Sequence, residues 1–279
     1  MNTPHVLAVL RPWIDAGEVG TMILERMEAN LGAKELGRLA TPGNFYDFTR
    51  YRPTTRWTND VREIMLPNTQ LHYAKVAGGN DFIFIHLLEP HMFGERYCES
   101  VFDILKRFNV QRYSLIGSMY DMVPHTRPLM ISGGLNGKTP TRILEKLGVF
   151  QGRYEGPTTI CNMISQEAQR AGMEIMTLLA HLPQYTEIDE DYNGVVALSR
   201  VIDYLYGIPV DDADKLKAER QLKKLDSAVL RSKKLKAIVA ELEGYYDSQA
   251  TARENAEPPK LSPEVEQFLK QMEKKFGAS

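Results

Sequence analysis

The sequence is poor in cysteine, with only Cys98 and Cys161 among 279 residues. Two cysteines so far apart form neither a disulfide framework nor the closely spaced pair of a zinc knuckle. The sequence also lacks a pair of histidines four residues apart with a carboxylate beside them, which is a common arrangement of zinc ligands on a helix. We therefore expect no metal site and no cofactor.

The sequence has no excess of either charge, because 34 lysines and arginines stand against 36 aspartates and glutamates. A net charge of −2 gives no reason to expect a nucleic acid or an anionic membrane as the partner. No apolar run approaches the roughly 20 residues that span a bilayer, and the first residues do not resemble a signal peptide. The sequence predicts a cytoplasmic protein that binds neither nucleic acid nor membrane.

Two glycine motifs are incomplete. Residues 133–139 end like a phosphate-binding loop, but Ser132 stands where that motif begins with glycine, and Pro140 follows where a helix should start. Ser118 follows a glycine but lacks the second glycine of a nucleophile elbow. We predict that residues 133–139 form a loop and that Ser118 is not an activated nucleophile.

Residues 45–57 (FYDFTRYRPTTRW) are unusually rich in side chains that anchor interfaces, with five aromatic residues and three arginines. The residues alternate as they would on a strand, where each parity shares one face. An edge strand whose rings cover the core while the arginines are solvated is the alternative interpretation. We expect a contact with a second subunit or another partner to be lined by Tyr46, Phe48, Arg50, Tyr51 and Arg52.

Short apolar runs alternate with amphipathic helical patterns up to about residue 207. Strands are predicted at residues 6–10, 70–77, 82–88, 112–116 and 174–180, and helices at 18–31, 97–108, 157–171 and 195–206. This alternation predicts an α/β fold with a mainly parallel sheet covered by helices on both faces. A turn at residues 78–81 predicts a hairpin, so the sheet should be mixed.

The composition changes after Pro209, and we divide the chain into an α/β domain (1–208) and a helical extension (209–279). Residues 211–247 have strong helical patterns, and residues 248–261 are predicted to be a linker. Ser262 and Pro263 then begin a terminal amphipathic helix with an apolar stripe. Such a short helix is not stable alone, so it must dock on its own domain or on a neighbouring subunit.

Polar residues follow three of the predicted strands. Ligands of parallel α/β sheets bind beyond the carboxyl ends of the strands, and the loops there supply acids, imidazoles and an arginine. If these loops converge, they form a general acid/base site or an anion site. The alternative is a rigid turn in which Arg127 bridges backbone carbonyls. The candidate pocket residues are Glu89, Tyr120, Asp121, His125, Arg127 and His181.

Several of these segments occur together in a known family. They are Tyr46-Asp47-Phe48 with Arg52-Pro53, Glu89-Pro90, residues 123–128 (VPHTRP), Gly156-Pro157-Thr158 and residues 180–185 (AHLPQY). In this order they resemble the PAC2 family, the proteasome assembly chaperone 2-like proteins, over roughly residues 5–250. The resemblance implies a three-layer α/β/α fold similar to phosphorylase/hydrolase-like proteins, a small helical extension, self-association and binding to other proteins.

The C-terminal residues depart from one pattern of that family. Archaeal relatives that dock on proteasomes end in a hydrophobic residue, a tyrosine and one further residue, whereas this sequence ends in Lys275-Phe276-Gly277-Ala278-Ser279. Docking on a proteasome through the tail is therefore not expected. The main hypothesis is a non-enzymatic, self-associating, assembly-chaperone-type protein. The alternative is a hydrolase or phosphorylase-like enzyme that acts on a small molecule with the strand-end loops.

Overall fold

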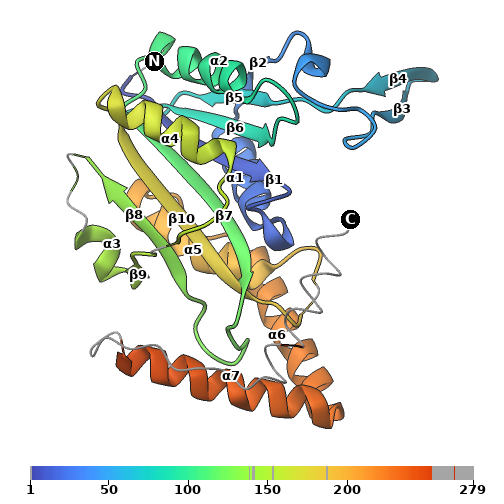
Figure 1. Cartoon of the computed structure of the whole chain (residues 1–279), viewed down its shortest axis with the longest axis vertical. Coiled ribbons are helices and arrows are strands. Elements are labelled where there is room, and N and C mark those ends of the chain that lie inside the picture. The colour runs from blue at the N-terminus through green and yellow to red at the C-terminus, as the bar shows by residue number, and fades with distance from the viewer. Residues whose placement is uncertain are drawn as a thin grey trace.

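The computed structural model describes residues 2–137, 139, 142–152, 154–186, 188–252 and 267. The strands of its main sheet are β1 (His5–Arg11), β2 (Lys34–Arg38), β5 (Gln70–Ala74), β6 (Phe82–Leu88), β7 (Arg112–Asp121), β8 (Ile131–Asn136), β9 (Val149–Phe150) and β10 (Glu174–Pro183). Their order across the sheet is β2-β5-β6-β1-β7-β10-β8-β9 (Figure 1). The four central strands, β6, β1, β7 and β10, are parallel. The predicted mixed, mainly parallel α/β sheet is confirmed.

The central strands are the most apolar segments of the chain. The side chains of β6 are buried on both faces from Phe82 to Leu87, and His86 is the only polar residue among them. Such a run suits a strand that has another strand on each side and helices above and below. The predicted turn after β5 is also confirmed, since β5 pairs with β6 in antiparallel register, Ala74 opposite Phe82.

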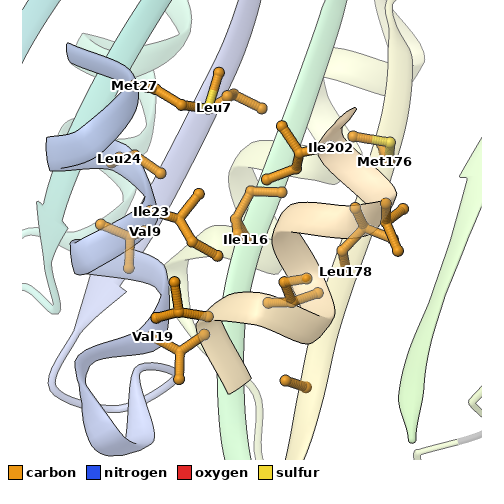
Figure 2. Packing of buried hydrophobic residues seen from close by; sticks show 14 of the residues in the cluster. Leu7, Val9, Val19, Ile23, Leu24, Met27, Ile116, Met176, Leu178 and Ile202 are labelled. Atoms are coloured by element: carbon orange, nitrogen blue, oxygen red, sulfur yellow. The ribbon is translucent and has the colours of Figure 1, made fainter. Parts of the chain in front are cut away.

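Helices cover both faces of the sheet. On one face, α1 (Val19–Leu31) and α5 (Tyr192–Tyr206) pack on β1, β7 and β10 (Figure 2). On the other face, α2 (Gly94–Arg107) and α4 (Ile160–Arg170) pack on the same sheet around Tyr97 and Tyr113. The Asp191 side chain accepts a hydrogen bond from the Gly194 backbone N–H (2.9 Å) at the start of α5. The three-layer arrangement places all strand ends at the rims of the domain.

The extension begins with two long helices, α6 (Asp212–Arg231) and α7 (Lys233–Ala252), which are separated at Ser232. They lie beyond the carboxyl ends of β7 and β10 (Figure 1), where Ile238 and Leu242 pack against Met122 and Tyr185. The predicted start of the linker at residue 248 is wrong, because α7 continues to residue 252. The rest of the predicted linker and the terminal helix, apart from residue 267, lie outside the described residues.

Residues 45–53 do not form a strand, and that prediction is wrong. The Asp47 side chain accepts hydrogen bonds from the backbone N–H and the hydroxyl of Thr49 (2.8 and 2.7 Å), and its carbonyl accepts from Arg50 and Tyr51. Aspartate commonly stabilises turns in this way. A strand starts only after Pro53: β3 (Thr54–Thr58) pairs with β4 (Val61–Met65) in a hairpin separate from the main sheet. We call residues 45–51 the aspartate turn and residues 54–65 the hairpin arm.

The remaining elements are short. They are the 3-10 turns η1 (Ala16–Glu18) and η2 (Pro42–Asn44) and the helix α3 (Arg142–Lys146). Residues 133–136, which we expected in a loop, belong to β8, antiparallel to β10. Throughout the part of the chain that is described, every helix is too short or too polar to cross a bilayer.

Gly133 and Gly134 provide a test of the packing between β8 and β10. A Cβ atom at Gly133 would lie 1.9 Å from the Thr177 carbonyl oxygen, whereas a Cβ at Gly134 would meet nothing within 4 Å. We expect Gly133→Ala to lower the free energy of unfolding by about 3 kcal/mol, because the strands must separate to admit the methyl group. Urea unfolding of both variants measures the difference. Equal stability of Gly133→Ala and Gly134→Ala would contradict this account.

Candidate functional site

The sequence-predicted pocket residues lie at the carboxyl ends of β6, β7 and β10, but they separate into several groups. Glu89 follows β6 and lies beside the aspartate turn. His125 and Arg127 contact the helical extension. Asp121 and His181 are paired with each other. The expectation that all of these loops converge in one crevice is therefore not met by the geometry.

Glu89 caps a helix. Both of its carboxylate oxygens accept the backbone N–H of Ile160, at 3.0 and 3.2 Å, in the first turn of α4. A carboxylate is stabilised there by the free N–H groups and by the helix dipole. Burial nevertheless raises the pKa of Glu89 above its ordinary value. The same side chain lines a cleft on the surface.

His125 and Arg127 connect the α/β domain to the extension. His125 Nδ1 lies 2.5 Å from the Tyr185 hydroxyl, and Nε2 lies 3.3 Å from Asp226 on α6. Arg127 forms a two-pronged ion pair with Asp247 on α7, with N–O distances of 2.7 and 2.9 Å. The hydrogen bonds to Asp247 raise the pKa of the Arg127 guanidinium above its ordinary value. These contacts attach the extension to the α/β domain, and the Arg127 guanidinium is paired with carboxylates on α7.

Asp121 and His181 form the one close pair within the predicted pocket set. His181 Nδ1 lies 2.6 Å from Asp121 Oδ2, and His181 Nε2 lies 2.7 Å from the hydroxyl oxygen of Ser132 on β8. Ser132 and His181 are largely buried. Tyr120 packs instead against the core on the α1 and α5 face, because consecutive strand residues point to opposite faces.

The Ser132–His181–Asp121 arrangement has the connectivity of a catalytic triad. If the His181 proton is on Nδ1, the ring donates to Asp121 and accepts from the Ser132 hydroxyl at Nε2. A pocket of about 330 Å³ is lined in part by Phe150, whose ring lies 5.3 Å from that of His181, but by none of the three residues of the cluster. The sequence did not indicate Ser132, because only the antiparallel pairing of β8 with β10 brings it to His181.

A cleft with a volume of about 860 Å³ lies next to the aspartate turn. Its lining combines that turn with the loop after β6, which are tied together because the backbone N–H groups of His91 and Met92 both donate to the Phe45 carbonyl. The Tyr51 and His91 rings lie 4.6 Å apart. The cleft is lined by Trp13, Tyr46, Asp47, Phe48, Thr49, Arg50, Glu89, Pro90, His91 and Met92.

The predicted interface residues differ in their exposure. Tyr46 is only 1% exposed, and its hydroxyl lies 2.6 Å from the Thr69 hydroxyl and 3.3 Å from that of Tyr97. Burial raises the pKa of Tyr46 to about 12. Its side chain packs in the core beneath the turn. Arg50 and Arg52 are exposed, while Phe48 and Tyr51 are half-buried.

The hairpin arm was missed by the sequence interpretation. Asn59 and Asp60 connect β3 and β4 with positive φ values of 49° and 63°, as a two-residue type I′ turn requires. An Asn-Asp pair between two alternating segments was the available signal. All ten strand residues of the arm are exposed, and it projects away from the main sheet (Figure 1). Its exposed large apolar residues are Trp57, Val61, Ile64 and Met65.

Within the described ranges, none of the candidate pocket residues belongs to a group of three metal-ligating side chains. The chemistry that these residues support is recognition by aromatic, arginine and apolar side chains at the cleft and arm, and proton transfer within the Ser132–His181–Asp121 cluster. The two places are separate, and they correspond to different kinds of function.

Comparisons with known proteins agree with this architecture. The family model described as "PAC2 family" matches residues 9–226. A PAC2 family protein from Streptomyces avermitilis superposes with a TM-score of 0.75 at 23% identity, covering 86% of this chain and 99% of that chain. A proteasome-assembly chaperone homologue from Mycobacterium tuberculosis gives 0.73 at 23% identity, covering 84% and 99%.

A more distant similarity extends to an archaeal proteasome activator from Pyrococcus furiosus. Its TM-score is 0.60 at 18% identity, and the match covers 82% of this chain and 94% of that chain. No curated protein matches the sequence. At these identities the solved structures establish the fold, and the matched family model establishes the relationship.

The contact between Arg127 and Asp247 predicts how the extension is attached. Arg127→Ala and Asp247→Ala should each increase hydrogen exchange in α7, because each variant removes the ion pair between Arg127 and Asp247. Arg127→Ala should have the larger effect, because it also removes the ion pair between Arg127 and Glu243 on α7. The double variant should add little to Arg127→Ala, since the ion pair with Asp247 is already lost in that single variant.

Lys215→Ala is the matched control, because Lys215 pairs with Asp212 within α6 and does not connect the extension to the domain. Exchange in α7 should stay at the wild-type level in this control. Additive effects of Arg127→Ala and Asp247→Ala would contradict a shared interaction.

Proposed function

The chain belongs to the PAC2 family, and from that premise we propose that it is a non-enzymatic, assembly-chaperone-type protein that binds other proteins, including a second copy of itself. A proteasome-assembly chaperone homologue and a proteasome activator are among the proteins that share the fold, which supports a role in protein contacts. The α/β domain (1–208) supplies the contact surface, and the extension (209–279) is a second, separately attached unit.

The single observation that carries this proposal is the hairpin arm. An isolated two-stranded hairpin is only marginally stable in water, because it lacks a third strand or a helix against which to bury a face. The register places Trp57, Arg62 and Ile64 on the same face of the arm. Trp57 is 68% exposed and Ile64 is 63% exposed. A partner surface that covers this face would bury apolar area and supply the missing packing.

The aspartate turn extends the same surface toward the cleft. Arg50 in the turn and Arg52 just after it are exposed and precede the arm along the chain. Arginine is enriched among the residues that contribute most to binding at interfaces. Phe48 and Tyr51 contribute half-buried rings whose positions are fixed by the packing beneath them. We infer that Phe48, Arg50, Tyr51 and Arg52 lie at the edge of the contact and the arm at its centre.

Self-association should be sensitive to both parts of this surface. We expect Trp57→Thr with Ile64→Thr, and separately Arg50→Ala with Arg52→Ala, to weaken self-association by at least about tenfold, since central aromatic and arginine contacts each contribute 1 kcal/mol or more. Sedimentation velocity over a concentration series measures the change. Thermal unfolding should differ little from wild type, because the altered side chains are exposed.

Arg200→Ala with Arg220→Ala is the charge-matched control, since both arginines are exposed on α5 and α6. If the control assembles as weakly as the arm and turn variants, net charge and not this surface determines assembly. A wild-type chain that is monomeric at all concentrations and recovers no bound protein from native cells would overturn the proposal.

A hydrolase is the second candidate function, and the Ser132–His181–Asp121 cluster is the observation that favours it. In such a reaction the Ser132 oxygen would attack an ester or amide carbonyl while its proton moves to His181 Nε2. His181 would pass that proton to the leaving group, and water would release the acyl group from serine. Ser132 lies on a regular strand and is 8% exposed, which limits access of a substrate.

A serine-directed fluorophosphonate distinguishes the two functions. A catalytic cluster should be labelled at Ser132, and labelling should be lost in Ser132→Ala and strongly reduced in His181→Gln, because the imidazole activates the hydroxyl. Ser118→Ala is the control, since its hydroxyl donates to the Ala16 carbonyl away from this cluster. Absence of labelling at Ser132 in the folded wild type would exclude a hydrolase that uses this serine. The cluster would then be a structural hydrogen-bonded contact between β7, β8 and β10.

A further inference from the structure

Three metal-ligating side chains meet between the C-terminal half of α1 and the strands β5 and β6. Glu28 lies on α1, His72 on β5 and His86 on β6. They are far apart in the sequence, since Glu28 precedes His72 by 44 residues and His86 by 58 residues. In the antiparallel register His72 pairs with Phe84 and Gln70 with His86, so the two histidines share one face of the sheet.

The donor atoms of these residues converge on one point. The Glu28 Oε1 atom lies 3.0 Å from His72 Nδ1 and 2.8 Å from His86 Nε2, and all three ligand atoms lie within 4.8 Å of one another. Around zinc, ligand bonds of about 2.0–2.1 Å in a tetrahedron separate neighbouring donors by roughly 3.3 Å. The two separations between the Glu28 oxygen and the imidazole nitrogens are therefore within about half an ångström of the spacing around a tetrahedral ion, and the two nitrogens lie at most 4.8 Å apart.

The surroundings leave room for a fourth ligand on one side only. The His86 side chain is 6% exposed, that of Glu28 16% and that of His72 26%. Solvent thus reaches the group from the His72 side. Glu35 lies opposite His72 in the pairing of β2 with β5 and has an exposed carboxylate on that side. A water molecule from this side can complete four-coordination, whereas the Glu35 carboxylate is paired with Arg38.

The chemistry of the donors selects the class of ion. Two imidazole nitrogens and one carboxylate oxygen match the three-residue ligand sets of zinc, which leave one position open. Magnesium and calcium prefer shells made of oxygen alone, so they fit this trio poorly. Without an ion, the same distances are those of two hydrogen bonds to one carboxylate oxygen. That arrangement is a preformed site whose ligands are already oriented.

We propose that Glu28, His72 and His86 form a binding site for one zinc-type divalent transition-metal ion, which links α1 to the β5–β6 hairpin. This site lies outside the cleft, the hairpin arm and the Ser132–His181–Asp121 cluster. Its occupancy cross-links segments that are 44 and 58 residues apart. Because β5 follows the hairpin arm directly along the chain, a bound ion steadies the strand from which the arm extends.

Metal titration of the whole chain tests the site. After dialysis against a chelator, the purified protein should bind one Zn²⁺ per chain by isothermal titration calorimetry, and its melting temperature should rise until one equivalent is added. Co²⁺ in place of Zn²⁺ should give the intense visible absorption of a tetrahedral nitrogen and oxygen site. Glu28→Gln and His72→Asn should each lower the affinity by at least about 100-fold, because each removes a direct ligand.

Glu25→Gln is the matched control, since Glu25 lies one turn earlier on α1 and is exposed. This variant should bind Zn²⁺ like wild type. Circular dichroism confirms that each variant is folded, and Glu28→Gln keeps a side-chain oxygen that accepts from both histidines. Two results would overturn the proposal and leave the trio as a hydrogen-bonded contact. One is failure of the wild type to bind one Zn²⁺ per chain, and the other is binding of Zn²⁺ by Glu28→Gln and His72→Asn with wild-type affinity.

Discussion

The rest of the structure depends on burial of the central parallel strands from both sides. Strands β6, β1 and β7 are each paired along both edges and are covered by α1 and α5 on one face and α2 and α4 on the other. A parallel sheet of this kind has no face left for a partner. Contact surfaces are therefore confined to the strand ends and to segments that leave the sheet. The cleft, the Ser132–His181–Asp121 cluster and the hairpin arm all lie in such places.

The same constraint explains which parts of the fold could be predicted from the sequence. A strand buried on both faces must be apolar throughout, so residues 82–88 identify β6 without reference to any contact. Residues 45–53 alternate like a strand, yet the Asp47 side chain and carbonyl bind the N–H groups that follow. Local bonds between a side chain and the backbone leave no periodic pattern, so the turn could not be recognised from periodicity.

Strand order decides how much of the candidate site was accessible to sequence reasoning. Asp121 and His181 lie near the carboxyl ends of the neighbouring parallel strands β7 and β10, and they meet. Strands β1 and β7 separate the end of β6 from β10, so Glu89 and His181 are kept apart. Ser132 joins the cluster through an antiparallel strand that was assigned to a loop. The Glu28–His72–His86 group draws one ligand from each of three elements, so no motif spacing could indicate it.

The chain that follows the hairpin arm, residues 68–72, is held firmly by the α/β domain. Asn68 forms two hydrogen bonds with the Leu39 backbone, both 3.0 Å long. The Thr69 hydroxyl lies in the buried network with Tyr46 and Tyr97. His72 follows, bound to Glu28. These three anchors within five residues fix the chain where it enters β5, three residues after the end of the arm. A partner that binds the arm thereby contacts a surface already oriented by the core, which lowers the entropy lost on association.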